Sequence, residues 1–209
     1  MKLPERVFFT GVPGSKWSSM SHELEKIDGT NHSDQTPERT YEPTKYAGYI
    51  PGKWTTGTMH RGSYFGYGME FEPILDDAYI DQAWTEDGGC KIVKSHDWAY
   101  MLDDIVTKFP NDWLMLIYRP NEVSHWWWCE HGGFNITYAK YHAYKDHTNM
   151  AKQIAIQNDS MLKFAHKHNL TWSYYTEQWI EQEFGQKINI DRPKDQWNDI
   201  LVTMFKGSK

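Results

Sequence analysis

The chain has 209 residues, a length that fits one domain with a sizeable core. Aromatic residues make up 16% of it, which favours a packed globule over a disordered chain. The formal net charge of −6 argues against a nucleic-acid partner, because nonspecific nucleic-acid binding relies on excess positive charge. No run approaches the roughly 20 apolar residues of a membrane helix, and the N-terminus lacks the apolar core of a signal peptide. We therefore expect a cytoplasmic protein with no membrane partner.

The first element is predicted at residues 6–12, an apolar run without alternation that is typical of a strand buried on both faces. A Gly-Pro-Gly turn follows, and Trp17, Met20, Leu24 and Ile27 then recur at helical spacing. The chain is therefore expected to begin with a strand, a tight turn and a helix.

Residues 28–73 form a long irregular insertion that is rich in Gly, Pro, Thr, Tyr and Asn. Irregular segments of this length are unusual inside a compact domain, and the many large rings distinguish this one from a linker. We interpret it as a lid or acceptor-binding region within a single domain of residues 1–209. Acceptor contacts are expected at 60–71, for which a loop that packs its own aromatic cluster is the alternative.

Strand and helix patterns alternate along the rest of the chain. Strands are predicted at 91–96, 113–119 and 170–176, and helices at 97–109, 120–130, 146–168, 176–184 and 194–206. This alternation indicates an α/β fold with a central, mostly parallel sheet flanked by helices. Ligands of such sheets bind at the carboxyl ends of the strands.

The turn after the first strand offers groups that suit an anion. Main-chain N–H groups at a helix start, together with Lys16, Ser18 and Ser19, would hold a phosphate or sulfate. The triphosphate pattern G-x-x-x-x-G-K-[ST] is absent, and the strand at 113–119 ends in Arg119 where a magnesium site needs an aspartate. These residues favour an anion bound without a metal. A tight turn in which a serine merely caps the helix is the alternative.

The strand at 91–96 carries two chemically useful side chains at its end. Lys94 and His96 are two residues apart, so on a strand they share one face. Histidine can take a proton from a hydroxyl near neutral pH, and lysine can neutralise the charge on a leaving oxygen. An edge strand with two solvated polar side chains is the alternative.

Three segments of the sequence together resemble one family. IVKSHDW (92–98) resembles the IVKTH-type motif of the sulfotransferases that use 3′-phosphoadenosine 5′-phosphosulfate (PAPS). VFFTGVPGSKWSSM (7–20) is similar to the 5′-phosphosulfate loop of that family, and LMLIYRPNEVSHWW (114–127) resembles its 3′-phosphate segment. The order of the three motifs agrees with the family across residues 6–130.

The chain departs from the family's pattern in two of these motifs. Gly14 occupies the basic position of the loop, whereas Lys16 stands two places later and Trp17 replaces a hydroxyl residue. One residue is missing from the 3′-phosphate segment, so Ser124 is the substitute for the family's serine. The tetrapeptide MFKG (204–207) is a weak match to a later phosphate contact of the family.

The resemblance implies a three-layer fold of the phosphate-loop type and an enzyme that moves a sulfuryl group from PAPS to a hydroxyl or amine, with no metal. It implies that His96 is the base and that Lys94 and Lys16 neutralise charge on the bridging oxygen and the sulfuryl group. The residues implied to bind the donor are Pro13, Gly14, Ser15, Lys16, Trp17, Ser18, Ser19, Arg119 and Ser124. The residues expected to contact the acceptor, a small molecule or a carbohydrate, are His60, Tyr64 and Phe65.

Two other function classes are open. A nucleotide kinase or phosphohydrolase on a similar sheet would need magnesium and ATP, and its motif and strand-end aspartate are missing. A degenerate relative would bind an anion or a partner protein without turnover.

Two further features of the sequence have structural interpretations. The WWWC run at 126–129 is expected to place at least one tryptophan in the core, because successive helical residues point about 100° apart. The histidines show no zinc-type spacing with Cys90 or Cys129, so we expect scattered surface histidines and no metal site.

Overall fold

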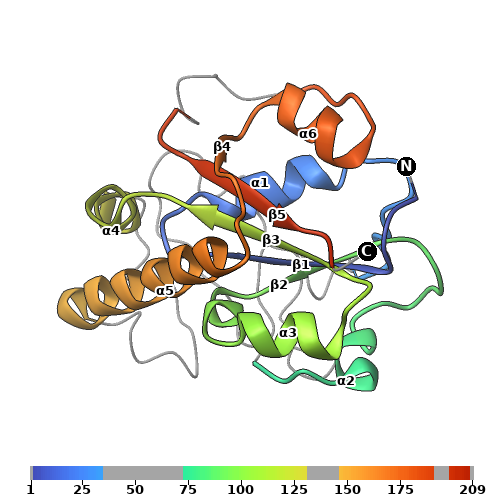
Figure 1. Ribbon diagram of the computed structural model, residues 1–209, viewed down its shortest axis with the longest axis horizontal. Coiled ribbons are helices and arrows are strands. Elements are labelled where there is room, and N and C mark those ends of the chain that lie inside the picture. The colour runs from blue at the N-terminus through green and yellow to red at the C-terminus, as the bar shows by residue number, and fades with distance from the viewer. Residues whose placement is uncertain (1, 35–72, 131–145, 191–197, 208–209) are drawn as a thin grey trace.

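The protein is described by a computed structural model, which covers residues 2–34, 73–130, 146–190 and 198–207. Within these residues the chain forms a five-stranded sheet with the order β2-β1-β3-β5-β4 (Figure 1). The strands are β1 (Arg6–Gly11), β2 (Lys91–Lys94), β3 (Trp113–Tyr118), β4 (Ser173–Tyr174) and β5 (Leu201–Phe205). β1 runs parallel to β2 and β3, whereas β5 pairs antiparallel with both β3 and β4.

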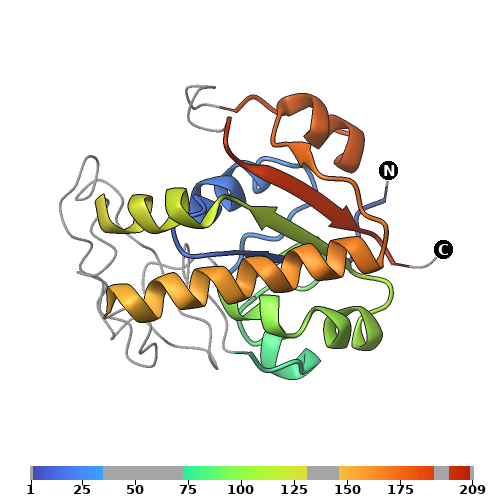
Figure 2. The ribbon, with the colours of Figure 1, turned by 60° about the vertical axis from the view of Figure 1, so that its left-hand side comes forward.

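Helices cover both faces of this sheet. They are α1 (Trp17–Leu24), α2 (Asp77–Asp81), the 3₁₀ helix η3 (His96–Tyr100), α3 (Leu102–Lys108), α4 (Asn121–Glu130), α5 (His147–Lys167) and α6 (Glu177–Phe184). α1 and α6 lie on one face, and η3, α3 and α5 lie on the other (Figures 1 and 2). None of the helices in the described part of the chain is both long and apolar enough to cross a membrane.

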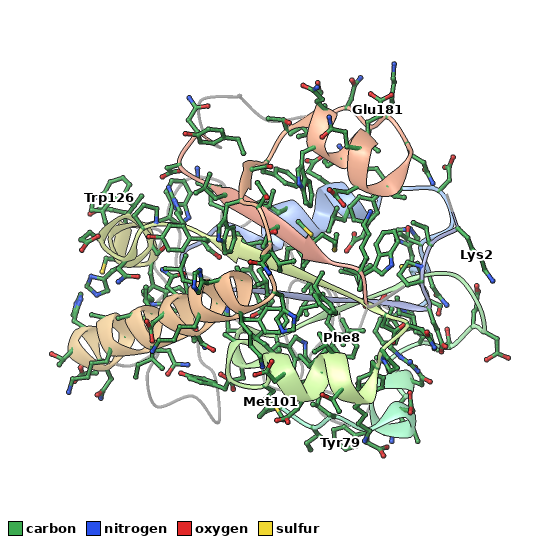
Figure 3. All side chains as sticks on the ribbon, in the orientation of Figure 1. Lys2, Phe8, Tyr79, Met101, Trp126 and Glu181 are labelled. Atoms are coloured by element: carbon green, nitrogen blue, oxygen red, sulfur yellow. The ribbon has the colours of Figure 1, made fainter. Side chains whose placement is uncertain are left out.

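Alternating side chains of the central strands fill a core on each face. Phe8 of β1 and Leu114 of β3 point to the face of α3 and α5, and Figure 3 shows Phe8 between the sheet and α3. Phe9 and Met115 point to the opposite face, where they pack with α1 and α6. Both faces of these strands are buried, which explains why their sequences are continuous apolar runs, as predicted.

Most of the predicted elements are confirmed with small shifts in their ends. The helix expected at 97–109 is divided into η3 and α3 at Met101, whose backbone is not helical. The strand expected at 91–96 ends at Lys94, because the Ser95 hydroxyl accepts from the Asp97 N–H at 3.2 Å and caps η3.

The prediction of a helix at 194–206 is wrong for the residues of this range that the structure describes. Residues 201–205 form β5, which pairs Leu116 with Thr203 beside the open edge of β3. Since β5 is antiparallel, its carboxyl end lies beside the start of β3, where Lys206 stands 4.4 Å from the Trp113 ring centroid. The MFKG segment is therefore at the edge of the sheet opposite the carboxyl ends of β1 to β3.

Candidate functional site

The loop of residues 12–16 joins β1 to α1 at the carboxyl edge of the parallel strands. Gly14 has a φ of +79°, and a Cβ atom there would lie 1.9 Å from the Ser124 carbonyl oxygen in α4. Only glycine fits this close approach between loop and helix. Any side chain is therefore excluded from position 14, and the lysine of this loop stands two residues later, at position 16.

Lys16 ends the loop in a left-handed conformation with a φ of 63°. Its carbonyl oxygen accepts from the main-chain N–H groups of Ser19 at 3.0 Å and Met20 at 3.2 Å, which starts α1. Its ammonium Nζ lies 4.0 Å from the centroid of the Trp127 ring, within the range of a cation–π contact. Lys16 therefore turns toward α4.

Ser15 is fully buried within the loop. Its main-chain N–H donates to the Val12 carbonyl oxygen at 3.0 Å. Its hydroxyl Oγ finds no hydrogen-bond partner among the described residues. A buried hydroxyl without a partner costs about 1–3 kcal/mol, so the Ser15 hydroxyl would be stabilised by a ligand oxygen if its side chain turned outward.

Arg119 follows β3 and is buried beside the same loop. Its Nη1 donates to the Gly14 carbonyl oxygen at 2.8 Å. Its Nε and Nη2 lie 2.8 Å and 2.7 Å from Oδ2 of Asp199. Its Cζ is 5.1 Å from the Trp127 ring centroid, so Lys16 and Arg119 pack on one tryptophan. Arg119 thus supports the loop, and Asp199 neutralises its charge.

Ser124 lies beneath the loop in α4. Its hydroxyl donates to the Arg119 carbonyl oxygen at 3.3 Å, and Asn158 of α5 donates to the same oxygen at 2.8 Å. The structure therefore gives Ser124 a positioning contact with the main chain at the end of β3. Asn158 and Asp199 were not identified from the sequence, because a single amide or carboxylate in a polar helix or loop carries no motif.

His96 begins η3 and is buried beside the end of β1. Its Nδ1 contacts the carbonyl oxygen of Gly11, and its ring centroid is 4.0 Å from that of Trp17. A carbonyl oxygen can only accept, so Nδ1 carries the hydrogen and Nε2 carries the lone pair. Burial lowers the pKa of His96 to about 4, and the Gly11 contact opposes this only in part. Near neutral pH the ring is therefore uncharged.

Lys94 is buried at the end of β2 and reaches α1. Its Nζ donates to the Ser21 hydroxyl at 3.3 Å. Burial lowers its pKa, and the carboxylates of Glu25 and Asp34 oppose that shift. Because the strand ends before His96, the two side chains do not share one strand face as predicted. Lys94 contacts Ser21 of α1, whereas His96 contacts Gly11 at the end of β1 and Trp17 at the start of α1.

The remaining predicted site residues have varied positions. Trp17 is in the core and stacks on Phe9 with ring centroids 6.1 Å apart, whereas Pro13 is buried in the loop. Ser18 and Ser19 belong to the first turn of α1, where Ser19 is half-buried. The acceptor residues His60, Tyr64 and Phe65, and the insertion from residue 35 to 72, lie outside the described residues.

The tryptophans of α4 confirm the prediction made for the WWWC run. Trp128 is buried in the core, Trp127 contacts Lys16 and Arg119, and Trp126 is 55% exposed. Figure 3 shows Trp126 on the outer side of α4. The three rings therefore occupy different environments.

A cavity of about 600 Å³ lies at the same edge of the sheet. Its lining includes Tyr174, Tyr175, Ile190 and Asn198. Tyr174 ends β4 and pairs with Leu201, as does Tyr118 at the end of β3, so both strands end at one edge. Asn198 is next in sequence to Asp199, which pairs with Arg119. The cavity is therefore close to the arginine that contacts the loop of residues 12–16.

Comparison with known proteins gives no relative. No protein-family model, curated protein or solved structure matches this chain.

Proposed function

We propose that this protein is a sulfotransferase that moves a sulfuryl group from PAPS to a hydroxyl or amine acceptor. One observation carries the proposal. His96 and Arg119, from two motifs far apart in the sequence, contact the carbonyl oxygens of Gly11 and Gly14. Three segments that resemble the family's motifs therefore meet at the end of β1 and the loop that follows it. On this proposal the α/β sandwich is of the phosphate-loop type.

The 5′-phosphosulfate is assigned to the loop of residues 12–16. The buried Ser15 hydroxyl would donate to one of its oxygens, which would satisfy a group that has no other described partner. Lys16 would supply positive charge, and its position beside Trp127 keeps the ammonium on the loop's surface near Arg119. Together these groups suit a dianionic sulfuryl–phosphate linkage.

The rest of the donor is assigned to Arg119 and the cavity beyond it. The 3′-phosphate would bind Arg119 by displacing Asp199, which now accepts from that guanidinium. The adenine would enter the cavity lined by Tyr174 and Ile190, whose exposed surface is mostly apolar although Glu177 and Gln178 also line it. Asn198 and Asp199 are consecutive, so one ligand can reach both places.

The transfer step uses groups of the chain as base and electrostatic support. Nε2 of His96 takes the proton of the acceptor hydroxyl as the acceptor oxygen bonds to sulfur. The bond from sulfur to the bridging oxygen breaks, and the electron pair leaves on 3′-phosphoadenosine 5′-phosphate (PAP). Lys16 neutralises the charge that develops on this oxygen. For Lys94 to take part, its ammonium has to exchange the Ser21 hydroxyl for the sulfuryl group.

A thermal-unfolding screen tests the proposal against the other two function classes. At a hundredfold excess over Kd, a ligand stabilises the folded chain by about 2.7 kcal/mol. At about 2–4 °C per kcal/mol for a domain of this size, PAP in the presence of EDTA should raise Tm by roughly 5–10 °C. Stabilisation by Mg-ATP alone would instead identify a kinase or phosphohydrolase.

Failure of both ligands to raise Tm would contradict the proposed donor. Stabilisation by PAP without transfer from PAPS to any acceptor in a panel of alcohols, phenols, amines and sugars would identify the anion-binding relative. The Arg119–Asp199 pair is the observation that favours this second outcome, because it already neutralises the arginine.

A further inference from the structure

Three potential metal ligands meet where α4 and α5 lie side by side. His125 and Cys129 are four residues apart on α4, which places them on one face of that helix. His147 is the first residue of α5. Figures 1 and 2 both show the two helices next to one another. The fold therefore brings together side chains of two helices, although Cys129 and His147 are 18 positions apart in the sequence.

The distances within this cluster fit a single ion. Cys129 Sγ lies 3.9 Å from His125 Nε2 and 3.6 Å from His147 Nδ1, and all three atoms lie within 4.8 Å of one another. With Zn–S of about 2.3 Å and Zn–N of about 2.0–2.1 Å, a tetrahedral site separates sulfur and nitrogen ligands by about 3.6 Å. Both measured separations are close to this value.

The chemistry of the donors selects the class of metal. Two imidazole nitrogens and one thiolate suit a borderline or soft transition metal, and Zn²⁺ commonly takes this set. Calcium and magnesium prefer oxygen ligands and are disfavoured. Three protein ligands leave a fourth tetrahedral position for a water molecule, which the exposure of His147 and the partial exposure of His125 and Cys129 permit.

We propose that His125, Cys129 and His147 bind one Zn²⁺ ion, which ties the last turns of α4 to the first turn of α5. The inference is independent of the proposed sulfotransferase activity. It concerns the same helix that carries Ser124 against Gly14 and Trp127 against Lys16. The ion would therefore also fix the helix on which the loop of residues 12–16 rests.

No metal site was expected from the sequence, because the histidines and cysteines show no paired zinc-type spacing along the chain. A histidine four residues before a cysteine is a weak signal alone, and the third ligand comes from another helix. Only the packing of α5 against α4 identifies His147 as a partner.

Cobalt substitution tests the site on the full chain without a polyhistidine tag. Co²⁺ should bind at one ion per chain and give the charge-transfer absorption of a thiolate–cobalt bond, and Zn²⁺ should displace it. Cys129→Ser should abolish this absorption, and His125→Gln and His147→Gln should each weaken Zn²⁺ binding by at least about tenfold. Zn²⁺ should raise Tm of the wild type and leave that of Cys129→Ser unchanged.

Two control variants match the chemistry of the substitutions. Cys90→Ala removes the other thiol, which is buried in the opposite core, and His166→Gln removes an exposed histidine of α5 outside the cluster. Both should retain the absorption and the Zn²⁺ affinity of the wild type. The absence of a thiolate–cobalt band from the wild type, or its persistence in Cys129→Ser, would overturn the proposal.

Discussion

His96 is fully buried and is also the residue proposed as the base. Its Nδ1 hydrogen is directed to Gly11, and its burial beside Trp17 favours the neutral ring. A neutral imidazole with the lone pair on Nε2 is the form that a general base needs. The same burial makes the stability of the fold depend on pH.

The pKa of His96 predicts how stability falls in mild acid. The folded pKa of about 4 is below the ordinary value of 6.5, so the unfolded chain binds a proton that the folded chain refuses between these values. The free energy of unfolding should therefore fall as pH drops from 6.5 to 4, by roughly 3 kcal/mol at about 1.4 kcal/mol per pH unit. Urea unfolding at pH 7, 5.5 and 4.5 measures this loss.

A His96→Gln variant supplies the control for this pH dependence. Glutamine keeps a polar side chain of similar size but does not titrate, so the decline of stability over this pH range should be reduced by the contribution of one group. An equally steep decline in wild type and variant would show that other groups cause it.

Position 14 shows which features of a single residue could be predicted from the sequence and which could not. The sequence shows a glycine at position 14 and a lysine at position 16, but it contains no reason for the glycine. That reason is the approach of the Ser124 carbonyl oxygen, which belongs to a helix more than a hundred residues later. Local sequence cannot contain such a contact. The partner of Arg119, Asp199, was missed for the same reason.

At the scale of elements, the junction between the loop and α4 determines the shape of the site. Gly14 touches the helix backbone, Lys16 contacts its Trp127, and Arg119 precedes its first turn. A change in the separation of loop and helix would therefore move both cations together.

A Gly14→Ala substitution tests this junction. Strain at a positive φ costs about 1–2 kcal/mol, and forcing an added methyl into a packed site costs about 1–3 kcal/mol more. Denaturant unfolding should therefore show a loss of at least about 2–3 kcal/mol. Gly88→Ala is the matched control, because Gly88 has a similar φ of +78° with nothing within 4 Å of the added atom. Equal losses in the two variants would contradict a close packing of loop on helix.

The elements themselves were predictable where one face or both are clearly apolar. β1, β3 and α5 were predicted because their apolar patterns are long and regular. β5 was mistaken for a helix because Ile200, Leu201 and Met204 also fit a helical stripe. The open edge of β3 offered hydrogen bonds that override this local pattern.

On the scale of the whole molecule, the amino and carboxyl ends of the parallel strands carry different kinds of groups. At the amino edge, the buried Arg6 pairs with Asp112 at 3.3 Å and with Asp81 at 3.0 Å, and Lys91 pairs with Asp81 at 2.8 Å. This network holds the starts of β1, β2 and β3 together. The carboxyl edge instead carries the loop of residues 12–16, His96 and Arg119. Strand polarity predicted that these groups would gather at one edge of the sheet, whereas the ion-pair network could be identified only from the fold.

Calorimetric titration of PAP in EDTA, on the wild type and two variants, tests the central claim most directly. Lys16→Met should weaken binding by at least about tenfold, since a hydrogen bond to a charged group contributes about 1.5–3 kcal/mol. Asp199→Asn should destabilise the fold, because it leaves Arg119 buried without its counter-ion, yet it should bind PAP at least as tightly as the wild type. A wild type that does not bind PAP, or a Lys16→Met variant that binds it equally well, would contradict the assignment of the loop.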